Sequence, residues 1–286
     1  MIVDKEANFV YFSERLKLDP RFTSTCNCIT EILDKCQVNY DFLKGTKDIW
    51  ARDYMPIQVS LDKFIEYRYD PDYLHTKKYS RDKTDPDFVC DEMDFKTTKT
   101  DLIIDGGNVI RSSDCVIMTD KVLNENEGNY SHTQLIDKLK QLFEVDKILL
   151  IPWDKENDCF GHADGMIRFI DDNTVLLQGY FDLYNELFKN KVYEQLKQNG
   201  LQWRDLRYNV ELEDEKNNWA YMNYMQTKDI LLIPKLGIEE DEQAYSQICG
   251  YFPEYNKMGR IRQVNMKEIL KYGGALNCIS WTIKIN

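Results

Sequence analysis

The feature that most limits the fold of this chain is a short polar motif that recurs at intervals of roughly 55 residues, or twice that. An interval of this size indicates repeated structural units, as in a propeller, and the residues that begin each unit would then meet at one end of a central axis. The motifs are Trp50-Ala-Arg-Asp53, Asp105-Gly-Gly-Asn108, Gly161-His-Ala-Asp164-Gly165 and Gly273-Gly-Ala-Leu-Asn-Cys278.

The segment that follows the third motif shows what one unit contains. Residues 166–170 and 174–177 are strand-like and flank a turn of Asp-Asp-Asn. Residues 182–199 then have the apolar spacing of a helix, which is expected to end at Gly200. A further strand is expected over 203–210. The unit is therefore two strands, a helix and a strand (ββαβ).

The other parts of the chain predict the same order of elements. Residues 70–100 are the exception, because no regular pattern is visible there. The expected strands are 56–60, 64–69, 102–104, 109–111, 116–119, 147–151, 220–225, 230–233 and 260–264, and the expected helices are 132–143 and 240–249.

The two ends of the chain are expected to form the fifth unit together. The C-terminal part is a strand over 277–285 after a short helix that is capped by Asn265 and stopped by Gly273. The N-terminal part is a strand, a helix and a strand, over 9–12, 26–36 and 38–42. A ring closed in this way has no seam. The prediction is one α/β propeller domain over 1–286; an open α/β sheet with hairpins is the alternative.

Composition excludes several classes of protein. A chain of 286 residues with 43% hydrophobic residues can build a core, and a formal charge of −12 disfavours nucleic acid and anionic membrane as partners. No apolar run reaches the length of a membrane span, and the start lacks the features of a secretory signal. A cytoplasmic protein with reduced cysteines is expected.

The cysteines and histidines do not predict a metal site. Cys26 and Cys28 form a pair, but no second pair lies at zinc-finger spacing, and the chain has only three histidines. The acidic residues do not form a calcium-binding loop either. The other cysteines outside the motifs, apart from Cys159, are expected to fill apolar space, namely Cys36, Cys90, Cys115 and Cys249.

The third and last motifs carry the side chains of a nucleophilic site. Cys278 follows two glycines at the start of a strand, where a thiol has an approach path and a nearby imidazolium can lower its pKa. His162 and Asp164 lie two residues apart, so they point the same way in an extended backbone, and flanking glycines leave room for a ligand. Any one of these residues alone would more often be structural; the combination favours function.

The first two motifs add acidic side chains. Asp105 follows a buried strand and precedes two glycines, where it can orient a histidine or hold a cation; a turn aspartate is the alternative. Asp53 follows Trp50, whose ring can lie over a planar cation. Arg52 can pair with a neighbouring acid and hold the loop. For Trp50 and Arg52 the alternatives are a core tryptophan and a surface ion pair.

Taken together, the four motifs resemble the agmatine deiminase and bacterial peptidylarginine deiminase family of the pentein superfamily. The resemblance covers nearly the whole chain, and it includes Pro56 after the first motif, the 221–234 segment and the closing Cys278-Ile-Ser. The family fold is a five-bladed α/β propeller of ββαβ units, which agrees with the repeat described above.

The resemblance implies a role for each motif residue. Cys278 would be the nucleophile and His162 the general acid and base, with Asp105 orienting His162. Asp53 and Asp164 would clamp the guanidinium, since paired carboxylates match its planar face. The thiolate would add to the guanidinium carbon, His162 would protonate departing ammonia, and water would release a ureido product. No metal or organic cofactor is expected.

Further residues bear on the substrate. Trp50 matches the aromatic residue that lies beside the substrate in the family, and Asn218 or Trp219, which open the fourth unit, are expected to contact the substrate tail. Asn277 stands where agmatine deiminases typically carry histidine, and Asp105 stands where many relatives carry glutamate.

The expected activity is hydrolysis of a guanidino group, with agmatine, converted to N-carbamoylputrescine in putrescine biosynthesis, as the first substrate. Protein-bound or free arginine is the alternative within the class. A guanidinium-binding protein without turnover is the alternative from another class, and it leaves Cys278 without a purpose. Cys159 is a rival nucleophile without a glycine approach. The expected partner is a small cationic guanidino compound, and no oligomeric state is predicted.

Overall fold

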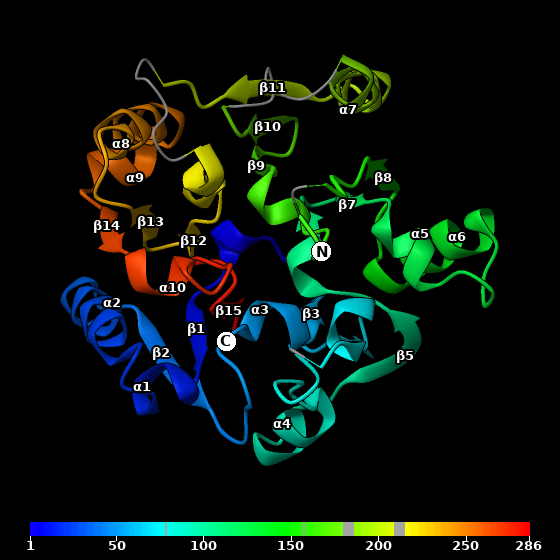
Figure 1. The fold of residues 1–286 in the computed structure, drawn as a ribbon, viewed down its shortest axis with the longest axis horizontal. Helices are drawn as coiled ribbons and strands as arrows, with labels where there is room; N and C mark the ends of the chain where they lie inside the picture. The colour runs from blue at the N-terminus through cyan, green and yellow to red at the C-terminus, as the bar shows by residue number, and fades with distance from the viewer. Residues whose placement is uncertain (78, 157, 180–185, 209–214) are drawn as a thin grey trace.

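The protein is built from five three-stranded sheets arranged around a central axis (Figure 1). The computed structural model describes residues 1–77, 79–156, 158–179, 186–208 and 215–286. In every sheet the middle strand pairs antiparallel with one neighbour and parallel with the other. The five-unit α/β propeller predicted from the repeat is therefore the observed architecture.

The strands follow the chain unit by unit. The first four sheets are β3 (Ile57–Gln58), β4 (Phe64–Arg68) and β5 (Thr98–Ile103); β6 (Ile110–Arg111), β7 (Cys115–Thr119) and β8 (Lys147–Ile151); β9 (Ile167–Asp171), β10 (Thr174–Leu177) and β11 (Gln202–Asp205); and β12 (Met225–Gln226), β13 (Leu231–Lys235) and β14 (Ile261–Asn265). The fifth sheet is β15 (Ser280–Ile283), β1 (Phe9–Ser13) and β2 (Asn39–Leu43).

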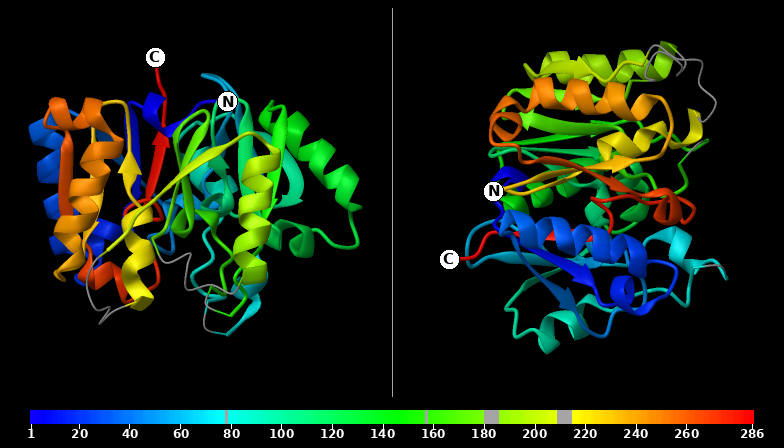
Figure 2. Two further views of the ribbon diagram at one scale, coloured as in Figure 1. Left: turned by 90° about the horizontal axis from the view of Figure 1, so that it is seen from above. Right: turned by 90° about the vertical axis from the view of Figure 1, so that its left-hand side faces the viewer.

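The longer helices, which connect the parallel strands, lie on the outside of the ring, whereas the short helix over Ala51–Tyr54 lies near the centre, as Figures 1 and 2 show. The α-helices are α1 (Arg15–Leu18), α2 (Thr23–Cys36), α3 (Ala51–Tyr54), α4 (Pro86–Glu92), α5 (Lys121–Glu125), α6 (His132–Phe143), α7 (Glu186–Gln198), α8 (Glu240–Tyr251), α9 (Pro253–Lys257) and α10 (Lys267–Leu270). The 3-10 helices are η1 (Asp4–Glu6), η2 (Asp72–His75), η3 (Gly106–Asn108), η4 (Ala163–Gly165) and η6 (Glu215–Met222).

The third unit illustrates why the sequence folds in this way. The turn after β9 reverses the chain, so β10 pairs antiparallel with β9, and α7 then carries the chain back so that β11 runs parallel to β10. The parallel connection requires a crossover of a dozen or more residues, which the helix supplies. Val175, Leu176 and Leu177 of β10 are all buried, as expected for a strand that is covered on both faces.

The first and last strands of the chain lie in the same sheet. Phe9 pairs with Ile283, and the antiparallel register continues to Phe12 and Ser280. The parallel partner of β1 is β2, so this sheet repeats the pattern of the other four. Joining the two ends leaves β1 with a partner on both sides rather than an open edge.

Two regions differ from the sequence prediction because short-range signals were misread. Residues 70–100, expected to be irregular, contain η2 and α4, and β5 begins at Thr98 rather than at residue 102. Asp85 caps α4 and Pro86 is its first residue, a combination that favours a helix start. Residues 220–222 of the expected strand 220–225 belong to η6, and only its last residue belongs to β12. Its apolar side chains are buried on all sides, which hides the helical period.

Smaller differences concern element ends. The α7 helix is described from Glu186, and residues 182–185 of its predicted range lie outside the described residues. The strand predicted over 203–210 ends at Asp205, and residues 209–210 lie outside the described part. Asn265, expected to cap the short helix that follows, is the last residue of β14. Its side chain nevertheless accepts a hydrogen bond from the N–H of Lys267 at 3.1 Å.

Within the described residues, no helix combines the length and hydrophobicity needed to cross a bilayer.

Candidate active site

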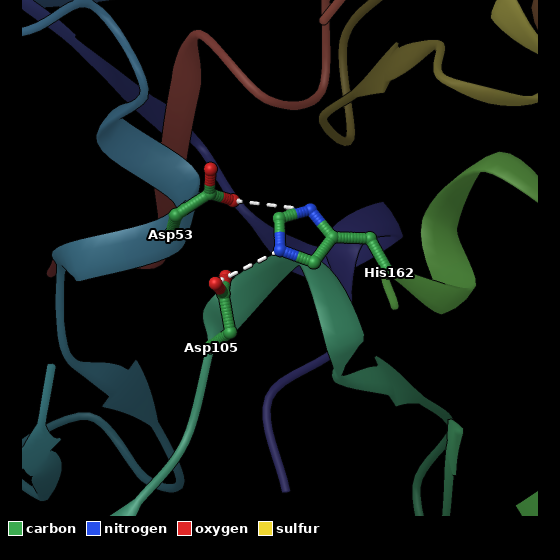
Figure 3. A group of neighbouring side chains, drawn as sticks. All are labelled: Asp53, Asp105 and His162. Atoms are coloured by element: carbon green, nitrogen blue, oxygen red, sulfur yellow. Dashed lines mark ion pairs between the residues drawn. The ribbon is translucent and has the colours of Figure 1, made fainter. Parts of the chain in front are cut away.

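Side chains from neighbouring units converge where α3, η3 and η4 contact one another. The imidazole of His162 lies between the carboxylates of Asp53 and Asp105, which come from two other units (Figure 3). His162 Nε2 is 2.9 Å from Asp105 Oδ2, and His162 Nδ1 is 3.9 Å from Asp53 Oδ1. The structure therefore brings together three residues that are spread over more than a hundred positions of the sequence.

Asp105 is placed by the turn that follows β5. It is the N-cap of η3, and its Oδ1 accepts a hydrogen bond from the N–H of Gly107 at 3.3 Å. The hydroxyl of Tyr73 donates to Oδ2. A Cβ atom on Gly107 would lie only 2.6 Å from His162 Nδ1, so the Gly-Gly step is needed for the imidazole to fit.

His162 is held by its own loop. Gly161 has a φ of 70°, a conformation that favours glycine. The N–H of His162 donates to Asp158 Oδ2 at 2.9 Å. Burial lowers the pKa of the imidazole, but the carboxylates of Asp105 and Asp53 outweigh burial and raise that pKa well above its usual value. The ring is therefore expected to be an imidazolium when the site is free.

Cys278 is the buried thiol of the site. Its Sγ lies 3.7 Å from Asp164 Oδ2. Burial raises its pKa well above the ordinary value, and the carboxylates of Asp164 and Asp53 raise it further. At neutral pH the free site therefore holds a thiol rather than a thiolate, and a bound cation would be needed to offset the carboxylates.

Asp164 is fixed by two carboxamides. The Nδ2 atoms of Asn223 and Asn277 each donate to Asp164 Oδ2 at 2.7 Å. The sequence analysis did not single out Asn223, although the residue lies in the 221–234 segment that carries part of the resemblance. An isolated asparagine in an apolar run gives no periodic or motif signal. Tyr73 and Asp158, which contact the site, were missed for the same reason.

Two buried polar atoms at the centre of the site have no hydrogen-bond partner among the described residues. They are Asp53 Oδ1 and His162 Nε2. Nε2 is close enough to Asp105 for an ion pair, but its N–H is not aligned for a hydrogen bond. Burial, and next the carboxylate of Asp105, raise the pKa of Asp53 well above its usual value. Unpaired buried polar atoms are rare in proteins, and they indicate a ligand that donates to Asp53.

The same three side chains also have the composition of a divalent-cation site. One ligand atom from each of Asp53, Asp105 and His162 lies within 4.8 Å of the others. Imidazole and carboxylate are ordinary ligands of such ions. A metal ion and a planar cation would use the same atoms, so only one of them can occupy the site at a time.

The tryptophans of the motifs pack against glycines at the edge of the site. A Cβ atom on Gly274 would lie 2.0 Å from the ring of Trp50, and one on Gly165 would lie 3.3 Å from the ring of Trp219. Both tryptophans are half-buried. The side chain of Asn218 lies outside the described side chains.

Three aromatic rings cover the histidine side of the site; we call Tyr73, Tyr79 and Phe160 the aromatic cap. Their centroids lie between 5.0 and 6.2 Å apart in edge-on contacts. Lys121, which is 4% exposed, forms an ion pair with Asp72, the residue before Tyr73; the distance from Nζ to Oδ1 is 2.6 Å. The cap therefore sits on an anchored segment and narrows the approach to His162.

A small cavity of about 30 Å³ lies behind the site and is lined by Arg52 and Asn277 but by none of Asp53, His162 and Cys278. Asp4 lies in it and pairs with Arg111 and Arg168 at 2.9 Å, while Arg52 is 3.9 Å away. The N–H of Arg52 donates to the carbonyl of Cys278 at 3.0 Å. Arg52, expected to form a surface ion pair or hold the loop, is buried and holds the nucleophile loop from behind.

The raised pKa of Cys278 predicts slow alkylation by a neutral reagent. Because only the thiolate attacks, iodoacetamide should modify Cys278 more slowly at neutral pH than the exposed Cys28, and the rate at Cys278 should keep rising with pH beyond the ordinary pKa of a thiol. Peptide mass spectrometry over a pH series measures both rates in one sample. Faster modification of Cys278 than of Cys28 at neutral pH would show that its pKa is lowered instead.

The chain thus brings a buried thiol, an imidazole and three carboxylates together within a ring of five ββαβ units, the fold of the pentein deiminases. Residues 19–283 match the Porphyromonas-type peptidyl-arginine deiminase family, and the chain belongs to that family. Its members are hydrolases that act on carbon–nitrogen bonds. No curated protein matches the sequence.

Solved structures share the fold at low sequence identity. The agmatine deiminase of C. jejuni is 19% identical, with a TM-score of 0.78 over 100% of this chain and 96% of its own. The agmatine deiminase of Enterococcus faecalis is 18% identical, with a TM-score of 0.72 over 99% and 95%. DDAH from Pseudomonas aeruginosa is 12% identical, with a TM-score of 0.58 over 97% and 100%.

Proposed function

We propose that this protein hydrolyses a guanidino group to a ureido group and ammonia, and that agmatine is its substrate. The observation that supports this most strongly is the buried, unpartnered Oδ1 of Asp53 beside His162. A guanidinium offers up to five N–H donors in one plane, so it can pair with Asp53 and Asp164 at once. The carbon between those nitrogens would then lie near Cys278, whose Sγ is 3.7 Å from Asp164.

The proposed reaction begins when the bound cation offsets the carboxylates that raise the pKa of Cys278. The thiolate then forms a carbon–sulfur bond to the guanidinium carbon. His162, an imidazolium in the free site, gives its proton to the departing nitrogen, and the carbon–nitrogen bond breaks to release ammonia. The product of this step is an amidino group on sulfur.

The second half of the reaction restores the enzyme. Neutral His162 accepts a proton from water as the oxygen adds to the amidino carbon. The carbon–sulfur bond breaks, Cys278 leaves as the thiolate, and the ureido product forms. The second water proton, left on the ureido oxygen, passes to solvent, where it converts the ammonia released earlier to ammonium. Cys278 then regains from solvent the proton that its thiol gave up when the cation bound. Asp105, 2.9 Å from His162, would hold the ring in place through both steps.

The charge of the site favours a substrate with no negative group. Burial raises the pKa of Asp48 to about 8. The carboxylates of Asp82 and Asp105 also raise it, whereas a hydrogen bond from the N–H of Trp50 lowers it. Burial also raises the pKa of Asp158. Further negative charge is thus disfavoured here. Free arginine would bring a carboxylate to this site, whereas agmatine brings a second cation.

Two alternatives remain: another guanidino substrate for the same reaction, or guanidinium binding without catalysis. The family name favours an arginine side chain of a protein as the second candidate. The aromatic cap argues for the smaller amine, because it narrows the approach. A guanidinium-binding protein without turnover has no use for Cys278. A cytoplasmic location is part of the proposal, since a reducing environment keeps the nucleophile a free thiol.

Trp50, Trp219 and Asn218 are proposed to contact the substrate. Trp219→Ala is expected to raise KM for agmatine by about tenfold with little change in kcat, because a ring that packs on the substrate tail contributes uniform binding. Steady-state kinetics with agmatine and with a shorter guanidine measure this effect. Unchanged kinetics for both compounds would remove Trp219 from the binding site.

The experiment that tests the proposal is ammonia and ureido product release from agmatine, free arginine and an arginine peptide, with and without EDTA. Turnover of agmatine in preference to the others, unaffected by EDTA, is the expected result. Preference for the peptide would make protein-bound arginine the substrate. Turnover that EDTA abolishes would assign Asp53, Asp105 and His162 to a metal ion instead of a guanidinium.

A further inference from the structure

Asn223 contacts three parts of the catalytic apparatus at once. Its Nδ2 donates to Asp164 Oδ2 at 2.7 Å. Its Oδ1 accepts the N–H groups of Asn277 at 3.0 Å and Cys278 at 3.1 Å. The side chain is fully buried, and it lies on the turn between η6 and β12. One carboxamide therefore ties the nucleophile loop to the substrate-binding carboxylate.

Asn277 completes the arrangement from the other side. Its Nδ2 donates to the same oxygen, Asp164 Oδ2, at 2.7 Å, and its N–H donates to the backbone carbonyl as well as the side chain of Asn223. Both amides bind Oδ2 and neither is shown on Oδ1. Two hydrogen bonds to the same oxygen fix the rotation of the Asp164 carboxylate.

We propose that Asn223 and Asn277 form an amide clamp that positions Asp164 for recognition of a planar amidinium or guanidinium. The inference rests on the proposed function and names the residues that give the same site its selectivity. An amide has no titratable proton at ordinary pH, so the clamp donates to Asp164 in one geometry whatever the pH. At position 277 a histidine, typical of agmatine deiminases, would donate only in some protonation states.

The clamp makes a prediction that does not depend on turnover. 2-Chloroacetamidine is a planar cation that alkylates thiols, whereas iodoacetamide is neutral. The ratio of their rates at Cys278 therefore measures recognition of the cation by the carboxylates. Losing one charge-assisted hydrogen bond to Asp164 is expected to lower this ratio about tenfold.

The experiment compares the wild type with Asn223→Ala, Asn223→Asp, Asn277→Ala and Gln58→Ala, with modification of Cys278 followed by peptide mass spectrometry. Gln58 is the matched control: it is 1% exposed, and both ends of its carboxamide bond to the backbone of Lys284. Asn223→Asp keeps an acceptor for the Cys278 loop but loses the donor to Asp164, so it separates the two roles. The clamp predicts a lowered ratio in all three asparagine variants and the wild-type ratio in Gln58→Ala.

Three other outcomes have distinct meanings. A wild-type ratio in Asn223→Asp and Asn277→Ala would overturn the clamp, and these two variants decide the question even if Asn223→Ala does not fold. A wild-type enzyme with no preference for the amidine would instead contradict guanidinium recognition, and with it the proposed function. Equal losses in Gln58→Ala would show that the ratio reports only on general packing, which would also overturn the clamp.

Discussion

Cys278→Ala is expected to lower kcat for guanidine hydrolysis by roughly 10⁴-fold or more, the range found when a catalytic nucleophile is removed. Cys278 lies in the turn before β15, and its Sγ is 3.7 Å from Asp164 Oδ2. Replacing it with alanine therefore removes the thiol that the proposed reaction uses as its nucleophile. Ammonia release under saturating agmatine measures the effect. The methyl side chain fits where the thiol was, so folding should be little changed.

The rival cysteine provides the control for this variant. Cys159 is exposed and lies three residues before His162, so Cys159→Ala removes a nearby thiol without touching the buried one. It should retain near-wild-type kcat, while Cys278→Ala should still bind agmatine by calorimetry because Asp53 and Asp164 remain. Full activity in Cys278→Ala, or its loss in Cys159→Ala, would reassign the nucleophile.

His162→Gln is expected to lower kcat by roughly 10²- to 10⁴-fold, the usual contribution of a general acid and base. Glutamine can still donate a hydrogen bond, but it can neither protonate ammonia nor take a proton from water. Both halves of the reaction should slow, whereas KM should change less because the two clamping carboxylates remain. Steady-state kinetics over a pH series measure both constants.

The pH dependence of kcat shows in which protonation state His162 acts. Because Asp105 and Asp53 raise the pKa of His162 against the effect of burial, the imidazolium persists above the usual pH range of histidine. Wild-type kcat should therefore fall only at a pH above that range, where the ring loses the proton it gives to ammonia. This alkaline decline should be absent from His162→Gln. An identical decline in both enzymes would assign it to another group.

Local patterns in the sequence were sufficient to predict most of the fold. The apolar runs of β9 and β10 and the apolar stripe of α6 are short-range signals, and the recurring motifs placed them in repeated units. The 220–225 segment was misread because its side chains are buried on all sides, so neither a strand nor a helical period stands out. The α4 helix was missed because its cap, Asp85-Pro86, lies in an otherwise polar stretch.

The sequence predicts the site residues that lie in recognisable motifs. It does not predict residues that reach the site only through the packing of adjacent units of the ring. His162 and Asp105 stand beside glycines, Asp53 lies in the Trp50-Ala-Arg-Asp53 motif, and the structure brings all three together. Asn223 has no such mark. Its partners Asp164 and Asn277 are 59 and 54 residues away, and only packing of adjacent units makes them neighbours.

The most direct measurement of the central claim is mass spectrometry of acid-quenched enzyme during reaction with agmatine, using the wild type and His162→Gln. The account predicts an amidino adduct on the peptide that contains Cys278, with more of it in His162→Gln if release of the adduct slows more than its formation. Turnover with the adduct on another cysteine, or turnover with no adduct in either enzyme, would contradict a covalent mechanism at Cys278.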